Sequence, residues 1–173
     1  TKAFSDAGIM VHAYLMYGFP TETEQETIDS LEIVRQLFQE KMIYSGFWHR
    51  FALTVHSPIG KNPEEYDVQI TGPEFAGFAK NELSHLDPLG CEHGKFSEGL
   101  KKALFNYMHD VGFEEDLDFW FEAQVPQTSH APDLIRQRLM EFYKPVKVFA
   151  KDRVLWLGGD LLIDDLKQEH YPH

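Results

Sequence analysis

An apolar run that ends in a tight turn and leads at once into a helix start, residues 7–23, most constrains how this chain can fold. The run has the length of a buried strand, and Gly18 and Pro20 end it. Thr23 and Glu26 then form a capping-box pattern. The stretch therefore predicts a strand whose carboxyl end meets the amino end of a helix. Ligands bind at such places in α/β folds, because free backbone N–H groups and the positive helix end lie there.

The residues that follow predict a strand–helix–strand unit. A helix is expected over Glu24–Lys41, with Thr21 and Glu24 as a second possible capping pair. Its apolar residues recur at three- and four-residue steps, at Ile28, Leu31, Val34 and Phe38. Ser45–Ser57 has the composition of the next strand, which Pro58 ends. Because a helical crossover joins the two strands, we expect them to pair in parallel.

The remainder of the chain is predicted to be mostly helical, with a β-prone tail. Helices are expected over 73–87, 97–111 and 114–123, and from Pro132 onward. Two short runs, 145–150 and 153–157, predict a hairpin. We expect 161–163 to form one more short strand or helical turn, and 168–173 to be frayed.

The opening stretch resembles the fifth-strand segment of radical SAM enzymes. The usual form there is Gly-hydrophobic-Pro-Gly-Glu-Thr. Gly18–Pro20, Glu22 and Thr23 match it, and Thr21 stands in place of the second glycine. The closest likeness is to the group that carries an amino-terminal cobalamin-binding domain. The resemblance is clear over roughly the first 60 residues.

The resemblance implies the fold class and the division of the chain. We expect an α/β fold in which residues 1–60 are the last strand–helix–strand units of a partial (β/α) barrel, the carboxyl-terminal part of that barrel. Residues 61–144 would form a helical cap region, and residues 145–173 a β-hairpin and tail.

The resemblance also implies cofactors that this chain cannot hold alone. Radical SAM enzymes bind a 4Fe-4S cluster through Cys-x-x-x-Cys-x-x-Cys, whereas this chain has one cysteine, Cys91. The expectation is therefore a fragment, inactive by itself, of an Fe-S oxidoreductase or methyltransferase. Cluster, S-adenosylmethionine and, in the group named above, cobalamin would be bound in the full-length parent. The first partner of the chain would be the upstream part of the same polypeptide.

Five residues are candidates for the wall of the cofactor or substrate site. The resemblance implies that Gly18, Phe19 and Pro20 line the S-adenosylmethionine pocket, and that Glu22 accepts a hydrogen bond from cofactor or substrate. The simpler interpretation is a tight turn, with Glu22 stabilising the helix dipole. The fifth candidate is His56, which shares a face of the second strand with Arg50 and Thr54. That face would meet substrate, or hold a satisfied internal polar network.

A metal site is weakly indicated and a structural explanation is favoured. His85, Cys91 and His93 offer zinc-type ligands, but no fourth ligand accompanies them and the Cys-x-His spacing is unusual for zinc. We therefore expect loop residues and no metal in this chain.

Composition bounds the classes of partner. A net charge of −12 without a basic cluster argues against nucleic acid and against an anionic membrane surface. No apolar run is long enough to cross a membrane, and one cysteine suits a reducing cytoplasm. The alternative function is a non-catalytic α+β protein-interaction domain. In either case we expect self-association through the exposed barrel edge.

Overall fold

The structure, a computed structural model, describes residues 1–72, 81–142, 161–164 and 169–172. The chain divides into two units, Thr1–Phe142 and Tyr143–His173. In the second unit the described residues form one antiparallel pair, β5 (Leu161–Asp164) with β6 (Glu169–Pro172). The short strand expected at 161–163 is therefore confirmed, and the prediction that the last residues are frayed is wrong for β6. The hairpin predicted from 145–157 lies outside the described residues.

The first unit is mixed α/β. Its elements in chain order are α1 (Lys2–Asp6), β1 (His12–Tyr17), α2 (Glu24–Gln39), β2 (Ser45–Arg50), α3 (Pro58–Lys61), η1 (Pro63–Tyr66), β3 (Gln69–Gly72), β4 (Ser84–Leu86), η2 (His93–Phe96), α4 (Ser97–Met108), η3 (Leu117–Trp120) and α5 (Leu134–Phe142). Within the described ranges each sheet has two strands. These residues do not establish a barrel, so that part of the prediction remains a proposal.

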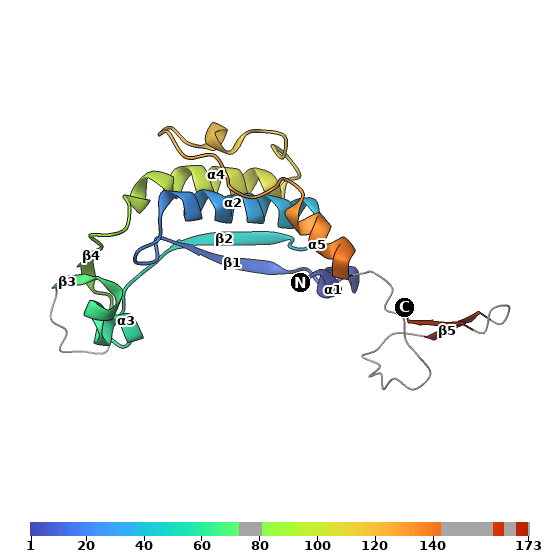
Figure 1. Ribbon diagram of the computed structural model, residues 1–173, viewed down its shortest axis with the longest axis horizontal. Helices are drawn as coiled ribbons and strands as arrows, with labels where there is room; N and C mark the ends of the chain where they lie inside the picture. The colour runs from blue at the N-terminus through green and yellow to red at the C-terminus, as the bar shows by residue number, and fades with distance from the viewer. Residues whose placement is uncertain (73–80, 143–160, 165–168, 173) are drawn as a thin grey trace. The chain divides into compact units, whose positions relative to one another are not determined.

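Among the residues that the structure describes, helices cover one face of the first sheet. β1 and β2 pair in parallel, as expected, with Leu15 opposite Trp48 and Tyr14 opposite Phe47. Both α2 and α4 lie on the same side of these strands (Figure 1). Trp48 is buried beneath them, whereas Tyr14 is 78% exposed on the opposite face. The period-two alternation of a strand therefore separates a packed face from an open one.

The main core lies between this sheet and its two helices. The predicted apolar stripe of α2 is confirmed, and α4 supplies a facing stripe. A capping box at Thr23 begins α2, as the sequence indicated. The fully or nearly buried members from the two helices are Ile28, Leu31, Val34, Phe38, Leu100, Leu104 and Tyr107. The buried face of the β1–β2 sheet is thus packed against α2 and α4 through apolar side chains.

A second, smaller core follows the carboxyl end of β2. It contains Leu53, Ile59, Val68 and Leu83. The segment after β2 pairs here with a segment distant in sequence, through Leu83 N–H to Leu53 O (2.8 Å) and Val55 N–H to Asn81 O (2.9 Å). This pairing brings the β3–β4 region beside the end of the sheet.

The same pairing explains two incorrect predictions. The strand predicted over Ser45–Ser57 ends at Arg50, because the chain then leaves β1 to pair with residues 81–83. The helix predicted over 73–87 is wrong for its described part, residues 81–87, where β4 forms instead. Tertiary pairing has overridden local helix propensity there. The helix predicted over 114–123 is reduced to the 3-10 turn η3.

A polar strap, residues 127–136, lies along α2. Asp29 accepts hydrogen bonds from the Ser129 N–H (2.6 Å), the Ser129 hydroxyl (2.7 Å) and the Thr128 hydroxyl (2.8 Å). Gln36 donates to Ala131 O (2.8 Å) and accepts from Ile135 N–H (2.9 Å). Burial alone would raise the pKa of Asp29, but these donors, with Gln25, outweigh it and lower the pKa to about 2. Side-chain hydrogen bonds therefore hold the strap on α2.

We expect Asp29→Asn to lower the free energy of unfolding by about 1–2 kcal/mol at pH 7. Because the folded-state pKa of Asp29 lies below its ordinary value of 3.8, the contribution is present above about pH 4. It should fade as pH falls toward about 2. Urea titrations at pH 7 and pH 3 would measure this, with Asp116→Asn as the control, since Asp116 makes no side-chain cap bond at η3. If Asp29→Asn lowered the free energy of unfolding equally at both pH values, the ionised Asp29 carboxylate would not be the group that holds the strap.

Candidate functional site

The loop between β1 and α2, residues 18–22, is the centre of the candidate site. Gly18 has φ +77° and Thr21 has φ +68°, both in the left-handed region. A Cβ on Gly18 would lie 3.3 Å from two side-chain atoms of His93 and 3.5 Å from Arg50 Cγ. The turn therefore depends on glycine both for its backbone conformation and for the close approach of His93.

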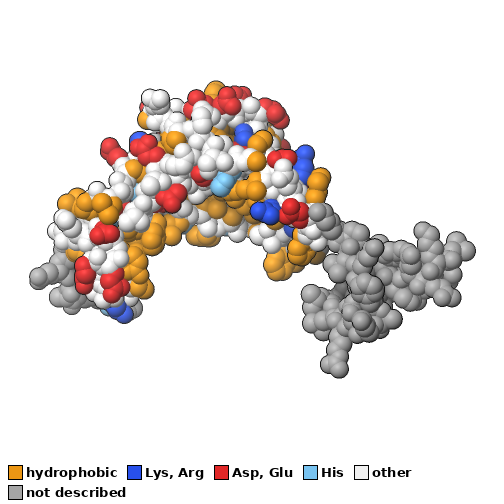
Figure 2. Space-filling model, in the orientation of Figure 1, with side chains coloured by type: hydrophobic (Ala, Val, Ile, Leu, Met, Phe, Trp, Pro, Cys, Tyr) orange, Lys and Arg blue, Asp and Glu red, His pale blue; other side chains and the backbone are white. Residues whose placement is uncertain are grey.

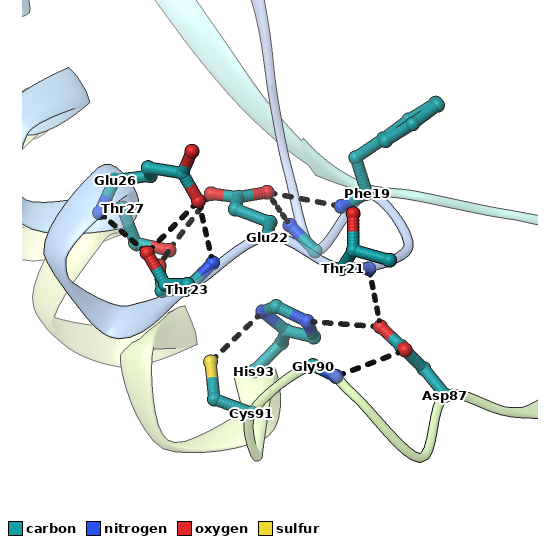
Figure 3. Close-up of polar contacts among 11 residues, drawn as sticks. Phe19, Thr21, Glu22, Thr23, Glu26, Thr27, Asp87, Gly90, Cys91 and His93 are labelled. Carbon is teal, nitrogen blue, oxygen red and sulfur yellow. Dashed lines mark hydrogen bonds and ion pairs between the residues drawn. The ribbon is translucent and has the colours of Figure 1, made fainter. Parts of the chain in front are cut away.

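The carboxylate of Glu22 closes this loop on itself. Its Oε2 accepts from the backbone N–H groups of Gly18 (2.6 Å) and Phe19 (2.9 Å), and its Oε1 accepts from the Thr27 hydroxyl (2.8 Å) (Figure 3). Both carboxylate oxygens are thus used within the protein. The structure gives Glu22 an architectural role, which differs from the dipole interaction considered for it in the sequence.

The adjacent capping box is also fully formed. Glu26 Oε2 accepts from the Thr23 N–H and hydroxyl, each at 2.8 Å, and the Thr23 hydroxyl accepts from Glu26 N–H (3.3 Å). Hydrogen bonds from the Thr23 N–H and then from its hydroxyl lower the pKa of Glu26. A shallow groove of about 310 Å³ lies over the loop, lined by Met16, Phe19–Glu22, Glu26 and Ser30.

A second segment, residues 87–93, supports the loop from below. Asp87 accepts from the Thr21 N–H (2.8 Å) and from the Gly90 N–H (2.9 Å). His93, 5% exposed, packs under Gly18 with its Nε2 4.0 Å from Asp87 Oδ2 (Figure 3). The sequence predicted neither role, because Asp87 before Pro88 resembled a helix stop. Only the fold brings these residues together, across more than 60 positions.

Cys91 and His93 adjoin, but they do not form an activated nucleophile. Cys91 Sγ lies 3.4 Å from His93 Nδ1. Burial and the nearby carboxylates of Glu24 and Glu22 raise the pKa of Cys91, and Lys95 only partly opposes them. Because the thiolate is the reactive form, a raised pKa disfavours nucleophilic chemistry at neutral pH.

Of the three residues considered as zinc-type ligands, Cys91 and His93 adjoin and His85 does not join them. His85 stands apart on β4, edge-on to Phe51 with ring centroids 5.9 Å apart. The described ranges contain no group of three His, Cys, Asp or Glu side chains placed to hold a metal ion.

The remaining predicted residues are dispersed. Arg50 ends β2 beside Gly18, and Thr54 forms a bridge with Glu82 in the smaller core. His56 is exposed on a turn after that bridge, so it shares no strand face with Arg50. The pairing that ends β2 early accounts for this separation.

The open face of the first sheet carries aromatic rings instead of the expected polar residues. Tyr14 and His49 stack at 5.0 Å between centroids, and Phe47 lies edge-on to His49 at 4.5 Å. Figure 2 shows hydrophobic side chains gathered over this face. An adjoining groove of about 540 Å³ lies between β1 and α2, lined by side chains that include Met16, Ile33 and Leu37. Strand β1 pairs only with β2 among the described strands, so its other edge is unpaired.

The chain matches no protein-family model, and comparison with curated proteins and with solved structures finds no significant match. Among the described residues no helix is long and apolar enough to cross a membrane.

The donor set decides which cofactors this chain can hold. With one cysteine in 173 residues, it cannot supply the thiolates of a 4Fe-4S cluster. For S-adenosylmethionine, the loop of residues 18–22 offers one contact surface and no full set of binding groups. The N–H groups of Gly18 and Phe19 already serve Glu22, which leaves the groove surface of Phe19 and Pro20 for contact.

Gly18→Ala should destabilise the protein more than Gly8→Ala. Both glycines have φ +77°, but a Cβ on Gly8 meets nothing within 4 Å, whereas one on Gly18 meets His93. We expect losses of about 1 kcal/mol at Gly8 and about 2–3 kcal/mol at Gly18. Urea unfolding of the two variants measures the difference, and equal losses would mean that His93 does not constrain the turn.

Thr21→Gly should stabilise the protein by about 0.5–1 kcal/mol. Thr21 is β-branched and has φ +68°, where glycine carries no Cβ penalty. The bond from the N–H of residue 21 to the Asp87 carboxylate uses only the backbone of residue 21 and therefore survives the change. Thermal unfolding would show a raised Tm, with Thr23→Gly as the contrasting variant because it removes the α2 cap. A lowered Tm for Thr21→Gly would show that contacts of the threonine side chain stabilise the protein by more than the left-handed backbone at this residue destabilises it.

Proposed function

We propose that this chain is the carboxyl-terminal segment of a radical SAM enzyme, supplying part of its cofactor and substrate wall. The observation that carries the proposal is the loop of residues 18–22, which follows the carboxyl end of a parallel strand and precedes a capped helix. The residues that match the family pattern are those that build this loop: Gly18, Pro20 and Glu22.

The departure from the pattern at Thr21 supports the same proposal. The family form has glycine there, and the backbone at Thr21 lies in the left-handed region that glycine favours. At this position the loop thus has a backbone conformation that glycine, the residue of the family pattern, adopts more easily than threonine.

The one-sided sheet agrees with a partial barrel. A parallel sheet is normally covered on both faces. Within the described part of the chain, β1 and β2 are covered on one face, one edge of β1 has no partner strand, and an apolar groove lies beside it. In the proposal the upstream part of the same polypeptide pairs with that edge. The open face of the sheet, which carries Tyr14 and Phe47, would then face the interior of the completed barrel.

The residues of this chain would contact and position the cofactor and would take no part in bond making or bond breaking. A 4Fe-4S cluster held by the upstream part of the polypeptide would supply the one-electron reduction chemistry. Phe19 and Pro20 would contact the cofactor across the groove, while Glu22, Asp87 and His93 would hold the loop that positions them.

The alternative is a non-catalytic α+β domain used in protein association. The exposed apolar side chains of the open face favour it, at Tyr14, Met16 and Phe47. An interaction domain would use this face for a partner without any cofactor.

The intact parent, reconstituted with iron and sulfide, should bind S-adenosylmethionine and cleave it reductively. Equilibrium dialysis and release of methionine measure the two steps. Phe19→Ala in the parent should weaken cofactor binding about tenfold if its ring forms the wall. Phe105→Ala is the control, since Phe105 is exposed on α4 and does not line the groove over the loop. A parent that neither binds nor cleaves S-adenosylmethionine would overturn the proposal and leave the association domain.

A further inference from the structure

The edge of β1 that faces away from β2 has backbone groups free for pairing. Tyr17 O accepts from Phe51 N–H (2.8 Å) at the end of the parallel pair, and the backbone groups of a strand alternate between its two edges. Every second residue back from Tyr17 therefore faces β2, and the residues between them face the other edge, where no described strand pairs with them. These outward-facing residues are His12, Tyr14 and Met16. Such an edge is a template for one more strand.

The groove of about 540 Å³ runs along the same edge, between β1 and α2. Leu15 and Trp48 line it from the sheet, and Ile33, Val34 and Leu37 line it from α2. An added strand would place every second side chain on this side of the sheet, since side chains alternate between the two faces. The groove is therefore suited to apolar side chains at alternate positions of that strand.

The groove is acidic at the end where β1 finishes. Helix α2 runs back along β1, so its first turns, with Glu26 and Asp29, lie near the carboxyl end of the strand (Figure 1). Although burial opposes the shift, hydrogen bonds from the strap lower the pKa of Asp29 to about 2, and those from Thr23 lower the pKa of Glu26. Both carboxylates are therefore ionised at neutral pH. Within the described part of the chain neither has an ion-pair partner, and His130, which also lines the groove, pairs with neither.

The charge at this end indicates which strand fits the edge. A Lys or Arg at the carboxyl end of a parallel strand would lie beside Glu26 and Asp29 and complement them. A second copy that paired through its own β1 would instead supply His12–Tyr17, which contains no Lys or Arg, and would bring a further net charge of −12. The edge and its groove are therefore complementary to a strand of different sequence.

We propose that the free edge of β1 is completed by a parallel β-strand with apolar side chains at alternate positions and a Lys or Arg at its carboxyl end. The backbone groups of His12, Tyr14 and Met16 supply its hydrogen bonds, and Glu26 and Asp29 hold its basic group. The strand comes from the upstream part of the same polypeptide, so the assignment of its source rests on the function proposed above. Its direction, side-chain pattern and charge follow from the groove.

Three synthetic peptides test this strand against the full 173-residue chain. The first, Val-Thr-Val-Thr-Val-Thr-Lys, has the expected pattern; the second has Glu in place of Lys; the third, Lys-Thr-Val-Thr-Val-Thr-Val, carries Lys at the amino end. Fluorescence anisotropy of the labelled peptides at low salt should show the first binding about tenfold more tightly than either of the others. No binding, equal affinities, or tightest binding by the third peptide would overturn the proposal.

Hydrogen exchange locates the bound peptide on the chain. The amide protons of His12, Tyr14 and Met16 should exchange about tenfold more slowly with the first peptide bound. Those of Ala13 and Leu15 are the internal control and should change little, because they already face β2. Binding without protection of the three outward-facing amides would place the peptide elsewhere and overturn the proposal.

Ser30→Lys tests the acidic end from the side of the protein. Ser30 is exposed on α2 and lines the groove beside Glu26 and Asp29, so a lysine there should remove the preference for the first peptide over the second. Gln39→Lys adds the same charge to the same helix outside the groove and should leave the preference unchanged. An undiminished preference in Ser30→Lys would overturn the assigned charge.

Light scattering of the chain without peptide tests the other occupant. A dimer in which the amides of His12, Tyr14 and Met16 are already protected would overturn the proposal in favour of a second copy on this edge. Peptide binding uses this chain alone and needs no cofactor. Failure of the strand and failure of S-adenosylmethionine cleavage in the parent are therefore separate results.

Discussion

The hydrogen bonding of the Gly18 and Phe19 N–H groups, which donate to the Glu22 carboxylate, is the interaction on which this structure most depends. It folds the end of β1 back toward the start of α2, and without it two donors would point into a turn that nothing else satisfies. The same carboxylate accepts from Thr27, a fully buried residue of α2. One side chain thus joins strand, turn and helix, and the positions of Phe19 and Pro20 follow from it.

The segment of residues 87–93 can support this loop only because β2 ends early. Once the chain leaves β1 after Arg50, it pairs with residues 81–83, and that pairing carries β4 to the end of the sheet. Asp87 then reaches the Thr21 N–H, and His93 reaches the space that Gly18 leaves. The smaller core therefore positions the segment that supports the loop. Its residues, Leu53, Ile59, Val68 and Leu83, do not themselves line the site.

Local sequence patterns predicted the parts of this fold that short-range physics determines. The capping box at Thr23, the apolar stripe of α2 and the parallel pairing of β1 with β2 were all predictable, because each depends on spacing within a few residues or on a short crossover. The end of β2, the β4 strand and the role of Asp87 were not, because they depend on contacts between residues far apart in the chain. For the same reason the sequence placed His56 on a strand face with Arg50, whereas it lies exposed on a turn.

The charges around the loop bear on what kind of chemistry this segment can support. Burial and the carboxylates of Glu24 and Glu22 raise the pKa of Cys91, which disfavours its thiol as a nucleophile at neutral pH. Because the backbone N–H groups of the loop already bind the Glu22 carboxylate, the loop presents its shape and the side chains of Phe19 and Pro20 to the groove. Such a surface is suited to contact with a ligand, which is the role proposed for it above.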